Sequence, residues 1–162
     1  MIASRGCPFN CYYCSSGNVL QRDQTPSRAV DEIESCLELG IKDILFFDET
    51  FTLNRKKVIG ICDEIEKRSL KFRWHARTRI DCLDIDLVRK MKRAGCRLLQ
   101  FGIETGSQRL QKVLNRNLNI EKIAANVRMV QNEGIVTYGN FMVNLPTETP
   151  EEMNQTIDFA IR

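Results

Sequence analysis

A repeated pattern of capped helix, glycine and apolar run most constrains the fold of this chain. Three expected helices end in a glycine that an apolar residue follows at once, at Gly40, Gly95 and Gly134. Glycine just past a helix can take the left-handed conformation that ends it. The apolar runs are typical of strands buried on both faces of a parallel sheet. Helices that alternate with such strands predict an α/β fold.

Capping residues stand at the starts of the expected helices. Thr25, Asn54 and Asp84 each precede apolar residues at helical spacing. Thr149 begins a capping box that opens the last helix. Expected strands cover residues 1–4, 44–47, 72–78, 98–103 and 136–143. We therefore expect about five βα units of parallel strands in a barrel or partial barrel, and a doubly wound open sheet is the alternative.

Composition and charge fit one ordinary globular domain, which we expect to cover residues 1–162. Hydrophobic residues make up 43% and charged residues 28%, and 24 basic against 21 acidic side chains leave a net charge of +3. So balanced a charge does not indicate binding to nucleic acid or to a membrane surface. No apolar run approaches the roughly 18 residues of a membrane helix. Residues 1–6 lack the apolar region of a signal peptide, so a cytoplasmic location is the default expectation.

Three of the seven cysteines crowd into one loop. Cys7, Cys11 and Cys14 form a C-x3-C-x2-C motif after the first expected strand, where the loops of a parallel α/β barrel build the active site. Three thiolates can each hold one iron of a 4Fe–4S cluster, and because a cluster normally takes four cysteines, one iron stays open to an external ligand. A structural zinc site needs four ligands, usually as two separated pairs. A zinc site and a chance cluster of cysteines are the alternatives.

With Tyr13 directly before Cys14, this loop resembles the signature of the radical S-adenosylmethionine (radical SAM) superfamily. The resemblance covers the whole chain and implies a partial (β/α)6 barrel. It implies an enzyme whose open iron binds the amino and carboxylate groups of S-adenosylmethionine. Reductive cleavage of this cofactor then gives methionine and a 5′-deoxyadenosyl radical that abstracts hydrogen from a substrate. A reductant such as flavodoxin or ferredoxin is the implied partner.

The segment after the second expected strand resembles a cofactor-binding motif of this superfamily. In many members this place holds a Gly-Gly-Glu-like motif, whose backbone binds the methionine amino group of the cofactor. Here Asp48 and Glu49 stand in a Phe-Asp-Glu-Thr-Phe-Thr segment. The segment resembles the Asp-Asp/Glu-Thr-Phe variant of the branch linked to cobalamin-binding domains. A plain polar loop between strand and helix is the alternative.

Three further residues match the superfamily at the ends of later strands. Glu104 ends the fourth expected strand, where the family places an acid or amide near the cofactor's ribose or amino group. Arg116 follows 12 residues later, a spacing shared with relatives whose arginine binds the methionine carboxylate. Asn140 falls where a polar residue meets the ribose. Asn144 replaces a glycine of the family pattern, and asparagine tolerates the left-handed conformation better than most residues.

The cobalamin-linked branch is the most similar one, and it implies a cobalamin-dependent methylation or rearrangement. Cobalamin is then a candidate second cofactor, held by a domain absent from this sequence. The sixth βα unit is also absent, so we expect a truncated core domain. Methylthiotransferase-like or coproporphyrinogen oxidase-like radical SAM enzymes are alternatives, and so is a non-enzymatic iron–sulfur or zinc module. The sequence does not indicate the substrate.

The other cysteines are not expected to bind metal. Cys36 and Cys62 lie on or beside apolar helix faces and should pack as small hydrophobic side chains. Cys82 and Cys96 lack the clustered partners of a second cluster. Two interpretations remain for four residues at or after the third expected strand: they face the substrate, or they pack within the sheet. These residues are Trp74, His75, Arg77 and Arg79.

Overall fold

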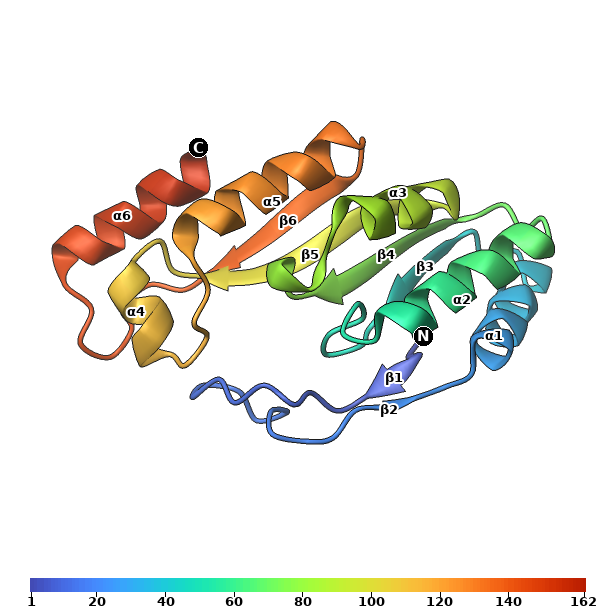
Figure 1. Ribbon diagram of the computed structural model, residues 1–162, viewed down its shortest axis with the longest axis horizontal. Coiled ribbons are helices and arrows are strands. Elements are labelled where there is room, and N and C mark those ends of the chain that lie inside the picture. Colours follow the sequence, from blue (N-terminus) through green and yellow to red (C-terminus); the bar gives the residue numbers. More distant parts are fainter.

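Four parallel strands form the sheet of this α/β chain, which a computed structural model describes from Met1 to Arg162 (Figure 1). Their order in the sheet is β3 (Asp43–Phe46), β4 (Arg73–Thr78), β5 (Cys96–Glu104) and β6 (Val136–Phe141). Strands that follow one another in sequence are also neighbours, as the winding of a barrel requires. The expected partial barrel is confirmed, and the doubly wound alternative, whose strand order reverses, is wrong.

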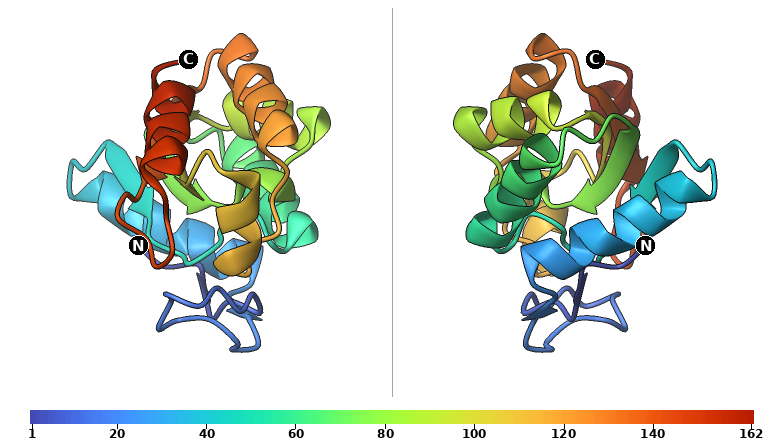
Figure 2. Two further views of the ribbon diagram at one scale, coloured as in Figure 1. Left: turned by 90° about the vertical axis from the view of Figure 1, so that its left-hand side faces the viewer. Right: turned by 90° about the vertical axis from the view of Figure 1, so that its right-hand side faces the viewer.

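Helices cover the outer face of this sheet and leave its inner face open (Figure 2). They are α1 (Pro26–Glu38), α2 (Arg55–Lys67), α3 (Ile85–Arg93), α4 (Gln108–Val113), α5 (Ile120–Asn132), α6 (Pro150–Ile161) and the 3-10 turn η1 (Ile80–Cys82). Side chains along β4 alternate accordingly, with Trp74 and Ala76 fully buried and His75 and Arg77 half-buried on the other face. None of these helices combines the length and the apolar character that crossing a membrane requires.

The capping residues begin the helices as the sequence predicts. The side chains of Thr25, Asn54 and Asp84 each accept a hydrogen bond from a backbone N–H in the first turn. Thr149 forms the expected capping box with Glu152 at the start of α6. A glycine with positive φ follows each of α1, α3 and α5. Because these interactions are local, the starts of the helices can be predicted from the sequence.

An aromatic cluster joins the loop after β3 to the core. The ring centroids of Phe46 and Phe51 are 4.5 Å apart, and that of Trp74 lies 5.4 Å from the first and 5.6 Å from the second. All three side chains are fully buried. Because Phe51 belongs to the loop, these contacts fix the neighbouring Asp48 and Glu49 relative to the sheet.

The first expected strand differs from the prediction. Only β1 (Ser4–Arg5) is a strand, and it pairs antiparallel with β2 (Arg22–Asp23), so that a hairpin encloses the cysteine loop. Met1 still reaches the edge of the sheet, where its amino group donates to the Leu45 carbonyl at 2.8 Å and its carbonyl accepts from the Phe47 N–H at 2.8 Å. The expected count of five parallel strands is therefore wrong by one, because beyond Met1 the backbone finds other partners: the Ala3 N–H donates to the Asp48 carboxylate, and the Ala3 carbonyl accepts from the Gln24 N–H.

Candidate active site

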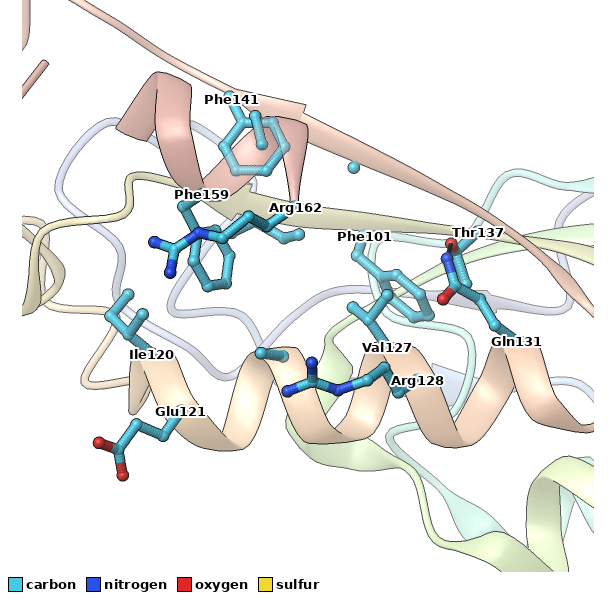
Figure 3. A pocket seen from close by; sticks show the side chains of 14 residues that line it. Phe101, Ile120, Glu121, Val127, Arg128, Gln131, Thr137, Phe141, Phe159 and Arg162 are labelled. Atoms are coloured by element: carbon cyan, nitrogen blue, oxygen red, sulfur yellow. Dashed lines mark hydrogen bonds between the residues drawn. The ribbon is translucent and has the colours of Figure 1, made fainter. Parts of the chain in front are cut away.

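A cavity of about 240 Å³ lies where the cysteine loop meets the carboxyl ends of the parallel strands. Every site residue predicted from the sequence lines it: Cys7, Cys11, Tyr13, Cys14, Asp48, Glu49, Glu104, Arg116 and Asn140. A larger cavity of about 530 Å³ opens between α5 and α6 (Figure 3), is lined mostly by apolar side chains, and contains none of these residues. The groups capable of chemistry therefore gather in the smaller cavity.

The cysteine loop presents three free thiols to this cavity. Cys7 and Cys11 are buried and Cys14 is exposed. The Cys14 N–H donates to the Cys11 carbonyl at 3.0 Å, and the Cys7 sulfur lies 3.7 Å from the Thr50 hydroxyl oxygen. No three side chains of the metal-binding types converge on a single point. A single zinc ion needs such convergence, whereas a cluster offers a different iron to each thiolate, so the donor set fits a cluster better.

The tip of the loop is tied to the segment that follows α4. The Tyr12 N–H donates to the Leu114 carbonyl at 3.2 Å. The Asn115 side-chain amide donates to the Asn10 carbonyl at 2.7 Å. Arg116 comes next in the chain, so these two bonds set its distance from the thiols.

Two arginines place positive charge beside Cys11. Nη1 of Arg116 lies 3.8 Å from the Cys11 sulfur, and Nη1 of Arg79 lies 4.0 Å from it. Arg79 also stacks on the Phe9 ring at 3.8 Å and forms two hydrogen bonds with the Asp81 carboxylate. Both arginines are buried. Two guanidinium charges therefore lie where a thiolate-ligated cluster would place negative charge.

Tyr13, Glu104 and Arg116 form one hydrogen-bonded group. The Tyr13 hydroxyl donates to Oε1 of Glu104 at 2.9 Å and accepts from Nη1 of Arg116 at 2.7 Å. The same Nη1 lies 3.6 Å from Oε1 of Glu104, and Nη2 donates to the Gly102 carbonyl. Burial raises the pKa of Tyr13 well above its ordinary value, although the charge of Arg116 opposes this shift. Nε of Arg116 is buried with no partner in the chain, an unmet donor that a bound carboxylate would satisfy.

A bulge in β5 directs Glu104 into this group. The register with β6 shifts between Gly102 and Glu104, and Glu104 has a φ of 73°. A side chain at Gly102 would collide with the Glu104 carboxylate. A left-handed conformation is uncommon for a residue other than glycine and occurs often at functional sites. Asn144 also adopts a left-handed conformation, with a φ of 63°, in line with its replacement of a glycine.

Asp48 lines the cavity, but its carboxylate oxygens accept hydrogen bonds from other groups of the chain. Oδ1 accepts from the Ala3 N–H at 2.9 Å, and Oδ2 accepts from the Ser4 hydroxyl and from Nζ of Lys57, the latter at 3.3 Å. Lys57 also lies 3.0 Å from the Ser4 oxygen and 3.5 Å from Asp23. The structure therefore makes Asp48 part of an anchor at the base of the cysteine loop, which the sequence does not predict.

Glu49 follows β3 and Asn140 lies on β6, the two outer strands of the parallel sheet. The Glu49 side chain is exposed and forms no hydrogen bond within the chain. The Asn140 oxygen accepts from Nε2 of Gln100 at 3.3 Å, and the Gln100 oxygen accepts from Nε of Arg77 at 3.3 Å. The sequence analysis does not name Gln100, and it leaves the role of Arg77 open between facing the substrate and packing. Their alternating positions on β4 and β5, which face the open side of the sheet, are the signal that could have found them.

Comparison with known proteins identifies the family. The family model described as the Radical SAM superfamily matches residues 1–160. The chain belongs to the radical SAM superfamily. Members of this superfamily are enzymes that use a 4Fe–4S cluster and S-adenosylmethionine. The expected family, class of enzyme and cofactors are therefore confirmed.

The relatives of this radical SAM chain include methyltransferases and cyclases. It is 36% identical to an uncharacterized methyltransferase of Pyrococcus horikoshii over 99% of the chain and 36% of that protein. It is 35% identical to the anaerobic magnesium-protoporphyrin IX monomethyl ester cyclase of Rubrivivax gelatinosus over 97% of the chain and 29% of that protein. The chain therefore spans about a third of the length of these relatives.

Solved structures agree on the fold. The cobalamin-dependent radical SAM enzyme OxsB, with aqua-cobalamin and S-adenosylmethionine bound, superposes with a TM-score of 0.90 at 20% identity, over the whole chain and 26% of OxsB. The methyltransferase TsrM from Kitasatospora setae, with cobalamin and a cluster bound, gives 0.89 at 22% identity, over 99% of the chain and 31% of TsrM. Coproporphyrinogen III oxidase from Escherichia coli gives 0.72 at 17%, over 98% of the chain and 40% of that protein. These structures share the fold of this chain, and two of the three are described as having cobalamin bound.

Proposed function

We propose that residues 1–162 form the core of a cobalamin-linked radical SAM enzyme that abstracts hydrogen from its substrate. One observation carries this proposal: the three thiols, the Glu104–Arg116 pair and Asn140 line one cavity although they come from distant parts of the chain. The cobalamin-dependent neighbours support cobalamin as a second cofactor, held by protein outside residues 1–162. Methylation or a rearrangement would be the outcome.

The residues of the cavity fit the two core cofactors. Cys7, Cys11 and Cys14 would hold three irons of the cluster. The unmet Nε donor of Arg116 fits the methionine carboxylate, and Asn140 fits the ribose. When bound, the cluster supplies the electron that cleaves S-adenosylmethionine to a 5′-deoxyadenosyl radical.

The remaining expected site residues act around this centre. Tyr13 holds the Glu104 carboxylate and the Arg116 guanidinium in one orientation through its hydroxyl. Glu49 stays available to a polar group of the cofactor. The Asp48 carboxylate anchors the cysteine loop, and the backbone of this segment stays available to the methionine amino group.

A reducing environment suits this site. All seven cysteines are free, and thiols persist in reducing compartments, which supports a cytoplasmic location. The exposed Cys14 leaves one side of the loop accessible. A flavodoxin or ferredoxin could supply the electron there.

Addition of S-adenosylmethionine should change the electron paramagnetic resonance spectrum of the reduced, cluster-loaded protein. The open iron gains nitrogen and oxygen ligands, so its electronic environment changes. Adenosine, which lacks the amino acid moiety, is the matched control and should leave the spectrum unchanged. A spectrum insensitive to S-adenosylmethionine, in a sample whose circular dichroism shows a folded protein, would refute the proposed function.

Arg116→Ala should weaken S-adenosylmethionine binding about ten- to a hundredfold. A charge-assisted hydrogen bond is worth about 1.5–3 kcal/mol, and about 1.4 kcal/mol corresponds to a factor of ten. Arg116→Lys should recover only part of the loss, because lysine lacks the planar fork. Equilibrium binding to cluster-loaded protein measures the effect, with the exposed Arg128→Ala as control. Equal binding by Arg116→Ala and Arg128→Ala would contradict the assignment.

A further inference from the structure

Three arginines line the active-site cavity, and two of them are committed to other groups. Arg79 forms two hydrogen bonds with the Asp81 carboxylate. Arg116 uses its terminal nitrogens for Tyr13, Glu104 and the Gly102 carbonyl. Of these three arginines, only Arg77 forms no salt bridge with an acid of the chain. Its positive charge in the cavity is therefore uncompensated.

The environment of Arg77 fixes its orientation without using its terminal nitrogens. Its guanidinium carbon lies 4.0 Å from the centroid of the Phe47 ring. Its Nε donates to the Gln100 side-chain oxygen at 3.3 Å, and Nε2 of Gln100 donates in turn to Asn140 at 3.3 Å. Neither terminal nitrogen donates to any group of the chain. Stacking on one side and a bond at Nε thus leave a preorganised pair of donors.

We propose that Arg77 binds an anionic group, a carboxylate or a phosphate, in the cavity beside the cluster. The inference rests on the proposed function, in which Nε of Arg116 already binds the methionine carboxylate of the cofactor. The anion at Arg77 therefore belongs to the substrate, whose acid group would be held while hydrogen is abstracted elsewhere. The one other source of the same chemistry is the methionine carboxylate of S-adenosylmethionine itself.

Binding of three probes to Arg77→Gln separates the two sources. The probes are S-adenosylmethionine, decarboxylated S-adenosylmethionine, and benzoate added to protein saturated with S-adenosylmethionine. Calorimetry on cluster-loaded protein should show benzoate binding about ten- to a hundredfold weaker in Arg77→Gln, with both cofactor forms unaffected. Benzyl alcohol is the uncharged control probe. Arg73→Gln, at the exposed start of the same strand, is the control variant.

Each outcome decides the assignment. Loss of benzoate binding alone supports a substrate anion, and weaker binding of S-adenosylmethionine but not of its decarboxylated form assigns the anion to the cofactor. Unchanged binding of all three probes, or equal effects of Arg77→Gln and Arg73→Gln, would overturn the proposal. If no cluster can be loaded, the proposed function fails, and benzoate titration of the metal-free chain still tests Arg77 independently.

Discussion

The variants Cys7→Ala, Cys11→Ala and Cys14→Ala are each expected to lose the iron–sulfur cluster. Each thiolate would hold a different iron, and a loop that offers two thiolates would leave two irons without a protein ligand. Anaerobically reconstituted native protein should contain about four irons per chain, and each variant close to none. Iron analysis together with visible absorption measures this difference.

Two other cysteines provide the controls for this experiment. Cys36 lies half-buried on α1, and Cys36→Ala should retain the iron. Cys82 is the sharper control, because it could serve as a fourth ligand. Burial, together with the charge of Asp81, raises the pKa of its thiol to about 11 although Arg79 opposes the shift, so its thiolate is harder to form than that of an ordinary cysteine. If Cys82→Ala lost the iron, the cluster would have four protein ligands and no open iron.

Lys57→Met should destabilise the fold by about 3–5 kcal/mol, the usual cost of leaving a buried charge unpaired. The side chains of Lys57 and Asp48 are 2% and 0% exposed. Without the ammonium group, the buried carboxylate of Asp48 loses its counter-charge. Urea unfolding of the metal-free protein measures the loss. Because β1 and β2 are held by this pair, the same variant should also load less iron.

A double variant separates the effect of charge from that of packing. Adding Asp48→Asn to Lys57→Met removes the unpaired charge and should recover part of the lost stability. Lys56→Met changes the exposed neighbouring lysine on the same helix and should have little effect. Equal stability of Lys57→Met and Lys56→Met would show that the buried pair does not anchor the loop.

The sequence predicts the features of this fold that depend on neighbouring residues. The capping side chains act within one helical turn, so the starts of α1, α2, α3 and α6 follow from Thr25, Asn54, Asp84 and Thr149. Apolar runs locate the four parallel strands within about two residues. The site residues follow from the loop motif and the strand ends, because the carboxyl ends of parallel strands meet at one edge.

Interactions between segments that are distant in the sequence cannot be predicted in this way. The pairing of β1 with β2 depends on partners across the cysteine loop, and the Lys57–Ser4 contact joins residues 53 positions apart. The bulge that turns Glu104 toward Arg116 depends on the register between two strands. The uncompensated charge of Arg77 becomes visible only when every acid of the chain has been placed.

The bonds between the tip of the cysteine loop and the segment after α4 impose an order on the maturation of this protein. Asn115 contacts Asn10 across 105 positions of the chain. Such contacts form late, because the intervening residues must be synthesised and folded before the loop can close. The thiols leave the ribosome well before Arg116, which lies against Cys11 in the finished site. The wall that Arg116 forms beside Cys11 is therefore complete only after this segment has folded against the loop, and until then the nascent thiols are open to oxidation.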